Sequence, residues 1–140
     1  MKVTIIDLCQ NSDKKRHLSF VVIISKYRGK YLFVKHKNRD TLEIPGGKIE
    51  YGETAYEAAE RELNEETGAI NFLLEAIFCY EVSTPLKTDY GMVFFADIKD
   101  RSSELNFEIG EVHELLEFPQ NCTYPDIQRK IFASYQSLRK

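Results

Sequence analysis

Three glutamates near the middle of the chain have the spacing of a metal-binding cluster. Glu62, Glu65 and Glu66 fall at positions i, i+3 and i+4, which share one face of an α-helix. Carboxylates this close repel one another, and near a helix C-terminus the helix dipole also disfavours negative charge. A bound cation would remove both penalties. Because the ligands are hard oxygens, the pattern favours Mg²⁺, Mn²⁺ or Ca²⁺ over zinc or copper.

The same triplet has a simpler interpretation, because glutamate-rich helices are common on solvated surfaces. We adopt that interpretation for Glu57 and Glu60, which point away from the triplet. For the triplet alone the two interpretations are comparable. The preceding segment decides between them, because Gly46 to Glu53 contains three glycines and two glutamates directly before the helix.

That segment and the helix after it resemble the Nudix box, G-x5-E-x7-R-E-U-x-E-E-x-G-U. One position departs from the box, since its final bulky aliphatic residue is Ala69 here, which affects packing and leaves the chemistry intact. The flanking residues 42–50 and 52–54 resemble the MutT branch, the nucleoside-triphosphate diphosphatases. The matching residues of the box are Gly47, Glu53, Arg61, Glu62, Leu63, Glu65, Glu66 and Gly68.

The resemblance implies Mg²⁺-dependent hydrolysis of a diphosphate linkage, with Mn²⁺ as an alternative metal. By this likeness the metal ligands would be Glu62, Glu65, Glu66 and the backbone carbonyl of Gly46. Divalent cations neutralise phosphoryl oxygens and lower the pKa of bound water. Glu62 would also orient or deprotonate the attacking water.

Arg61 would be catalytic by holding the cluster in shape, through a pair with Glu53 or Glu65. Nudix enzymes often recruit one more glutamate from a later loop. Here we favour Glu108 over Glu111 as that additional metal ligand, because Glu108 precedes the expected strand. A solvated acidic loop is the alternative for both residues.

Substrate contacts lie outside the box. Asn121 resembles the asparagine that MutT-like enzymes present to a purine edge, although a turn or a helix cap explains it equally well. Tyr80 or Tyr90 could stack on a base, whereas Phe78 is expected in the core. The remaining candidates for contact with the substrate are Gly47, Lys48 and Arg39.

The box helix has clear start and stop signals. Thr54 and Glu57 form a T-x-x-E capping box, and Gly68 is a natural terminator, so we expect a helix over 55–67. A second helix is expected over 124–138, where apolar residues recur at helical spacing.

Strands are expected on both sides of the box helix. Val and Ile dominate 19–24, which is typical of a strand buried on both faces. Residues 42–44 form a short extended piece that ends at Pro45-Gly46-Gly47, where we expect a sharp turn. Further strands are expected over 31–36, 72–82 and 90–98, with one more within 107–118. The fold class is therefore α+β, an α/β/α sandwich with the Nudix fold, in one domain over residues 1–140.

Composition limits the partners and the compartment. The chain has 140 residues, with 19 Lys+Arg against 22 Asp+Glu and a net charge of −3. An extended nucleic-acid footprint would favour a basic chain. No apolar run approaches the roughly 20 residues that span a bilayer. Three scattered cysteines indicate a reducing compartment, so we expect a cytoplasmic protein.

The expected activity converts a nucleoside triphosphate, with an oxidised purine such as 8-oxo-dGTP among the candidates, to a monophosphate and pyrophosphate. Alternatives with the same chemistry are an RNA 5′-pyrophosphohydrolase and an ADP-ribose-type pyrophosphatase. A nucleotide-sensing Nudix module is the non-enzyme alternative, which retention of the three box glutamates disfavours. The partner is a small nucleotide, and the chain is expected as a monomer or homodimer.

Overall fold

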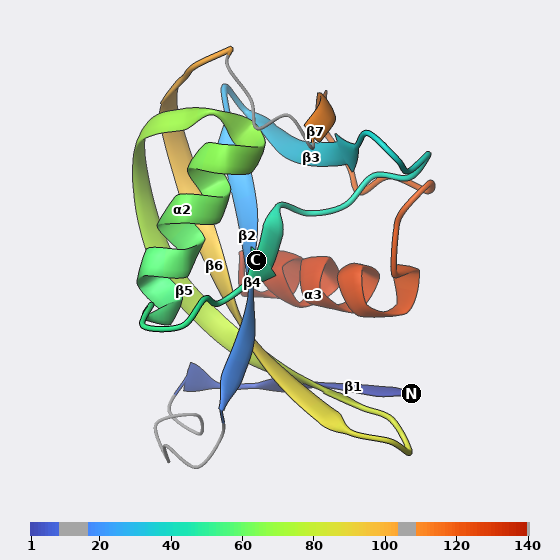
Figure 1. The fold of residues 1–140 in the computed structure, drawn as a ribbon. Coiled ribbons are helices and arrows are strands. Elements are labelled where there is room, and N and C mark those ends of the chain that lie inside the picture. The colour runs from blue at the N-terminus through green and yellow to red at the C-terminus, as the bar shows by residue number, and fades with distance from the viewer. Residues whose placement is uncertain (9–16, 104–108, 140) are drawn as a thin grey trace.

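The computed structural model describes residues 1–8, 17–103 and 109–139, and places a mixed β-sheet between two helices (Figure 1). The strands are β1 (Lys2–Ile6), β2 (Leu18–Tyr27), β3 (Lys30–His36), β4 (Gly46–Lys48), β5 (Ala69–Ser83), β6 (Thr88–Arg101) and β7 (Ile109–Leu115). The helices are α2 (Ala55–Thr67) and α3 (Pro125–Leu138).

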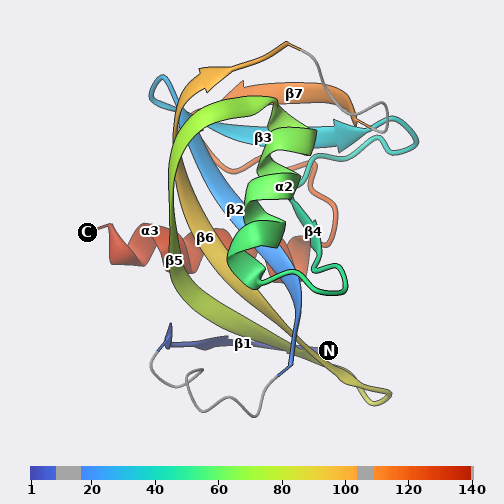
Figure 2. The same ribbon diagram turned by 60° about the vertical axis from the view of Figure 1, so that its left-hand side comes forward.

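The strand order is β1-β5-β6-β2-β3-β7, and β4 pairs with β2 beside this path. The pair β2–β6 is parallel, whereas the other named pairs are antiparallel. Helix α2 lies in front of the sheet and α3 behind it (Figure 2). The predicted α+β sandwich, with a mixed sheet flanked by the box helix and the C-terminal helix, is confirmed.

The central strand β2 divides the core into two layers. Val21 and Ile23 belong to the cluster that includes the buried residues of α2. Val22 and Ile24 belong to the cluster that includes those of α3. Successive side chains of a strand point to opposite faces, so an uninterrupted apolar run covers both layers at once.

Helix α2 begins and ends where its signals predict. The Thr54 side chain accepts a hydrogen bond from the Glu57 backbone N–H at 3.1 Å, and the Glu57 carboxylate accepts one from the Thr54 N–H at 2.9 Å. Gly68 ends the helix in the left-handed region, with φ of 78°. This conformation costs glycine little and other residues more.

The sharp turn expected at Pro45-Gly46-Gly47 is limited to a bend at Pro45 and does not include the two glycines. Gly46 and Gly47 belong to strand β4, which pairs with β2 at Val22 and Val21 respectively. Both glycines are needed for close approach and not for a turn. A Cβ on Gly46 would overlap the carbonyl oxygen of Val21, and one on Gly47 would overlap the carboxylate of Glu62.

Two further extended segments complete the sheet. Residues 42–44, expected as a short extended piece, form single bridges, Val34 with Glu43 and Leu42 with Cys122. Strand β1, which the sequence patterns do not predict, pairs with the second half of β5. Neither of the two helices in the described ranges is long and apolar enough to cross a membrane.

Candidate active site

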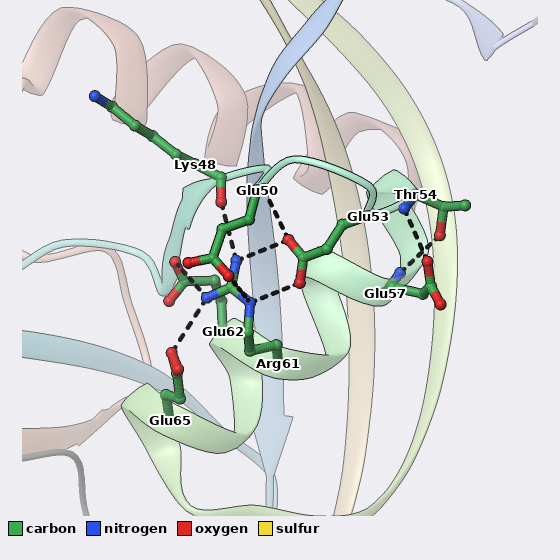
Figure 3. Close-up of polar contacts among 8 residues, drawn as sticks. All are labelled: Lys48, Glu50, Glu53, Thr54, Glu57, Arg61, Glu62 and Glu65. Carbon is green, nitrogen blue, oxygen red and sulfur yellow. Dashed lines mark hydrogen bonds and ion pairs between the residues drawn. The ribbon is translucent and has the colours of Figure 1, made fainter.

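Arg61 lies at the centre of a cluster of carboxylates on α2 and the loop before it (Figure 3). Its Nε donates to Oε2 of Glu53 at 2.7 Å and its Nη2 donates to Oε1 of the same carboxylate at 3.0 Å. Nη1 donates to Glu65 at 3.2 Å, and Nη2 also donates to the carbonyl of Lys48 at 3.0 Å. One guanidinium therefore joins the helix, the loop and strand β4, and it contacts both partners expected from the sequence.

The pair between Arg61 and Glu53 is charged on both sides. The guanidinium lowers the pKa of Glu53 to about 2, and the backbone N–H of Glu50 acts in the same direction. Glu53 in turn raises the pKa of Arg61. A two-point bond between a planar guanidinium and a carboxylate also fixes direction, which a lysine could not reproduce.

Glu62 faces strand β4. It is the carboxylate that a Cβ on Gly47 would overlap, so the absence of a side chain at Gly47 lets the two elements meet. Burial raises the pKa of Glu62 to about 7, the charge of Glu66 adds to this effect, and the charge of Arg61 opposes it. A nearby cation would stabilise the ionised form of this carboxyl group.

Glu66 is the most buried of the three box glutamates, at 6% exposed. Its Oε1 accepts a hydrogen bond from the Gly46 N–H at 2.9 Å, and its Oε2 lies 3.3 Å from Nε2 of His36. Burial raises the pKa of Glu66, although the bonds from His36 and Gly46 oppose the shift. The pKa of His36 is raised in turn, chiefly by its hydrogen bond to Glu66.

Sequence reasoning missed His36 and its second neighbour, Glu43, whose Oε1 lies 3.4 Å from Nε2 of His36. Both residues contact the site from outside the box. His36 ends strand β3, and no regular spacing links it to the glutamates of α2. The only available signal was its place at the end of a predicted strand, directly before the loop that leads into the box.

The three box glutamates share one helix face, but their carboxylates do not meet at one point. Glu65 is turned to Arg61 and Glu66 to β4. Within residues 1–8, 17–103 and 109–139, no three His, Cys, Asp or Glu side chains are arranged to hold a metal ion. The donor chemistry nevertheless fits a hard divalent cation, because Glu66 is buried, Glu62 is partly buried, and the charge of Glu66 raises the pKa of Glu62.

The candidate additional ligand Glu108 lies outside the described residues. Its alternative, Glu111, is on β7, where its carboxylate lies 2.7 Å from Nε2 of His113. This contact gives Glu111 a local partner on its own strand. The choice between Glu108 and Glu111 remains a prediction.

Two of the candidates for contact with the substrate are cations, Lys48 on β4 and Arg39 after β3. Lys48 is opposite Phe20 in the β2–β4 pair, so both side chains share a face of the sheet, and Lys48 extends away from Arg61 (Figure 3). Arg39 is paired with Glu43 at 2.9 Å and lies over the Tyr124 ring at 5.6 Å. Arg39 could contact a phosphate only if it gave up its pair with Glu43. Lys48 has no such partner to leave among the residues drawn in Figure 3, where its ammonium group extends away from the box carboxylates.

Asn121 ties two loops together. Its Nδ2 donates to the carbonyl of Asp40 at 2.7 Å, and its own backbone carbonyl accepts from the Leu42 N–H at 2.9 Å. The side chain therefore stabilises a loop, which agrees with the alternative interpretation of Asn121 as a turn residue. A role in purine recognition has no support from these contacts.

A cavity of about 270 Å³ lies on the α3 side of the sheet, next to the residues of β2 that pair with β4. Tyr80, a candidate for contact with the base, belongs to its wall and is only 5% exposed. Asp89 and Gln128, which sequence reasoning missed, also lie in the wall. The remaining lining residues are Phe20, Val22, Val82, Tyr124 and Ile127.

Comparison with known proteins agrees with this geometry. The family model described as NUDIX domain matches residues 15–135. The Bacillus subtilis protein named "Putative 8-oxo-dGTP diphosphatase YtkD" is 38% identical over 96 residues, which cover 69% of this chain and 58% of that protein. A second Bacillus subtilis protein, named "Putative 8-oxo-dGTP diphosphatase", is 36% identical over 80 residues, which cover 57% of this chain and 52% of that protein. The chain thus spans between half and three-fifths of the length of these relatives.

Solved structures show the same fold. The Bacillus subtilis pyrophosphohydrolase BsRppH has a TM-score of 0.79 and 27% identity, and the alignment covers 99% of this chain and 96% of that one. The NUDIX domain of Shewanella oneidensis NrtR, complexed with ADP ribose, has a TM-score of 0.66 and 15% identity, over 90% of each chain. With the family model matched over most of its length and the box residues gathered around Arg61, this chain belongs to the Nudix hydrolase family.

Proposed function

We propose that this chain hydrolyses nucleoside triphosphates with Mg²⁺ to a nucleoside monophosphate and pyrophosphate, in the cytoplasm. Nudix hydrolases generally use divalent metal ions, and when bound such an ion supplies charge neutralisation for the phosphate chain. The observation that carries the proposal is the pair of sites on either side of β4. Box carboxylates lie on one side, and a cavity sized for a ring system lies on the other.

The box residues have distinct parts in this reaction. Glu62, Glu65 and Glu66 would hold the metal. Glu62, whose carboxylate lies against Gly47 of β4 and 3.5 Å from Nη1 of Arg61, would also orient or deprotonate the attacking water. Arg61 acts through others, since its bonds fix where the acidic loop sits on the helix.

The similarity to named relatives supports a nucleotide as substrate. Two relatives carry the name 8-oxo-dGTP diphosphatase, and we propose an oxidised or ordinary purine nucleoside triphosphate as the substrate class. A second candidate is the 5′-triphosphate end of an RNA, which the likeness to a pyrophosphohydrolase over nearly the whole chain favours. The two substrates share the same chemistry and differ in whether a longer chain is attached to the first nucleotide.

Product analysis tests the proposal. The protein is incubated with Mg²⁺ and a panel of nucleoside triphosphates, 8-oxo-dGTP, ADP-ribose and a short 5′-triphosphate RNA, and the products are identified by mass. We expect monophosphate and intact pyrophosphate, with ¹⁸O from labelled water in the monophosphate. Release of orthophosphate with a nucleoside diphosphate would exclude the proposed bond cleavage, and turnover of ADP-ribose alone would exclude the substrate class.

A further inference from the structure

His36, the last residue of β3, has two carboxylates close to one of its ring nitrogens. Its Nε2 lies 3.3 Å from Oε2 of Glu66 on α2 and 3.4 Å from Oε1 of Glu43, in the segment before β4. The side chains are 26% exposed for His36, 14% for Glu43 and 8% for Glu66. Two acidic side chains that are largely withdrawn from water thus share a single imidazole, and one of the two is a box glutamate.

The sheet brings these three side chains together. Leu32 of β3 belongs to the core cluster beneath α2, and His36, four residues later, faces the same side because the side chains of a strand alternate. Glu43 is joined to Val34 of β3 by two backbone hydrogen bonds of 2.9 Å, one in each direction. Side chains that are diagonal neighbours across such a pair are within reach of each other. Backbone pairing therefore fixes the position of Glu43 relative to His36.

Both oxygens of the Glu66 carboxylate have a partner outside α2. Oε1 accepts a hydrogen bond from the Gly46 N–H at 2.9 Å, and Oε2 is the oxygen close to His36. A carboxylate that is held at one oxygen can still swing about that contact, whereas one held at both oxygens has a fixed plane. His36 therefore supplies the second of the two contacts that set the direction of the Glu66 oxygens.

Glu43 makes this contact more important. The negative charges of Glu43 and Glu66 act on each other, and an ionised carboxylate can only accept hydrogen bonds, so the ring nitrogen facing both must carry the hydrogen. The imidazole N–H offsets part of the repulsion between the two carboxylates. Glu43 is also anchored, because its Oε2 accepts from Nη1 of Arg39 at 2.9 Å. Without the imidazole, the repulsion would therefore displace Glu66 and leave Glu43 in place.

We propose that His36 is a positioning residue, whose Nε2–H orients the Glu66 carboxylate and thereby increases the affinity of the box for a divalent cation. The inference rests on the proposed function, in which Glu66 is one of the metal ligands. Groups that orient a ligand contribute to metal affinity although they do not touch the ion, and their loss costs about 10- to 100-fold in affinity or activity. His36 thus acts through Glu66, from outside the box.

Binding of Mn²⁺ in the absence of nucleotide tests the proposal. The metal-free protein is titrated with Mn²⁺, and the EPR signal of the free aqueous ion gives the dissociation constant, so no turnover is needed. His36→Leu removes the donor, and we expect its dissociation constant for Mn²⁺ to be about tenfold higher than that of the wild-type protein. A constant equal to or lower than the wild-type value would overturn the proposal.

Two amide variants show whether the donor itself is required. His36→Gln places an amide N–H close to the position of Nε2, whereas His36→Asn carries the same amide on a shorter side chain that does not reach Glu66. We expect His36→Gln to bind Mn²⁺ within about threefold of the wild-type affinity and His36→Asn to bind about tenfold more weakly. Equal affinities in the two amide variants would overturn the proposal, and this comparison holds even if His36→Leu does not fold.

Lys35→Gln is the matched control on the same strand. Lys35 lies two residues after Phe33, which belongs to the core cluster on the α3 side, so its side chain points away from Glu66. We expect its dissociation constant for Mn²⁺ to equal that of the wild-type protein, with circular dichroism confirming that each variant is folded. A loss of affinity in Lys35→Gln as large as that in His36→Asn would assign the effect to the strand and overturn the proposal.

The same proteins separate this inference from the proposed function. Unchanged Mn²⁺ affinity in His36→Asn, in a protein that releases pyrophosphate from triphosphates, would overturn the inference and leave the function standing. Weaker Mn²⁺ binding in His36→Asn that is restored in His36→Gln, in a protein that releases no pyrophosphate, would do the reverse. A wild-type protein that binds no Mn²⁺ would overturn both.

Discussion

Glu66 of α2 and Gln128 of α3 accept hydrogen bonds from the same short segment, at backbone N–H groups two residues apart. Gly46 donates to Glu66 at 2.9 Å and Ile44 donates to Gln128 at 2.7 Å. The segment is therefore held from both layers of the sandwich at once. A carboxylate of the proposed metal site and an amide of the cavity wall keep a fixed separation because they bind one piece of backbone.

Removing a charge from the box should abolish most turnover and preserve the fold. Glu66→Gln keeps Oε1, which accepts from Gly46, and Glu65→Gln reduces repulsion within the cluster. For each variant we expect kcat at saturating Mg²⁺ to fall by at least about 10-fold, with an unchanged circular dichroism spectrum. Glu60→Gln, on the exposed face of the same helix, is the matched control. Wild-type kcat in the first two variants would contradict their assignment as ligands.

Gly47→Ala should separate activity from stability. The new Cβ would overlap the end of the Glu62 side chain, which is flexible and can move aside, so the fold survives while the carboxylate is displaced. We expect kcat to fall about 100-fold, with Tm changed by no more than about 4 °C. Gly110→Ala is the control, because its Cβ would lie at ordinary contact distance, 3.4 Å, from the Lys35 carbonyl oxygen. If both variants keep full activity, Glu62 has no positional role.

Glu53 should contribute stability that disappears in acid. Its pKa is about 2 in the folded protein against an ordinary value of 4.5, so the unfolded chain takes up its proton first as the pH falls. The contribution is complete above about pH 4.5 and is lost as the pH falls toward 2. In EDTA, the Tm difference between the wild-type protein and Glu53→Gln should be constant from about pH 8 to 5 and shrink below that. A difference that does not vary down to about pH 3 would be inconsistent with the Arg61–Glu53 pair.

The hydroxyl groups of Tyr31 and Tyr135 form a hydrogen bond of 3.0 Å behind the sheet. Tyr135→Phe should lower the free energy of unfolding by about 0.5–1.5 kcal/mol, because Tyr31 is partly exposed and can bond to water instead. Urea unfolding measures this change, and kcat should be unaffected. Tyr56→Phe, at an exposed position of α2, should change stability little. Equal losses in the two variants would show that the Tyr31–Tyr135 bond contributes nothing specific.

Asn121→Ala should leave base preference intact. Since the Asn121 amide donates to the Asp40 carbonyl, its loss should loosen the loop and lower the free energy of unfolding by about 1 kcal/mol. The relative rates of hydrolysis of the nucleoside triphosphates, measured by the product analysis described above, should equal those of the wild-type protein. A change in these relative rates would contradict this expectation and indicate that Asn121 contacts the base.

Local signals predict the box helix accurately because its ends are determined by adjacent residues. Thr54, Glu57 and Gly68 lie within the helix termini that they define. Strand β1 has no such signal, since its partners are residues 79–83, far along the chain. Strand β4 is hidden for a different reason: its glycines are unusual in strands, and only the close approach of β2 and α2 explains them.

Two features of the cavity wall had signals that could have been used. Phe78 is expected in the core, and Tyr80, two residues later on the same strand, must then face the same layer. Gln128 lies three and seven residues before Ile131 and Tyr135, which places it on the buried face of α3. The contact of His36 with Glu66 had no comparable signal, because it depends on how α2 packs against a strand that precedes it in the chain.

The pairing of β2 with β4 sets a limit on changes in chain length. Phe20, Val21 and Val22 are matched one to one with residues 48, 47 and 46, and neighbours on a strand point to opposite faces. One inserted or deleted residue in either strand would turn Gly47 away from Glu62 and replace it by Gly46 or Lys48. Insertions should therefore be tolerated at the hairpin turns, at Gly29 and within 84–87, and be lethal to activity within 20–22 and 46–48.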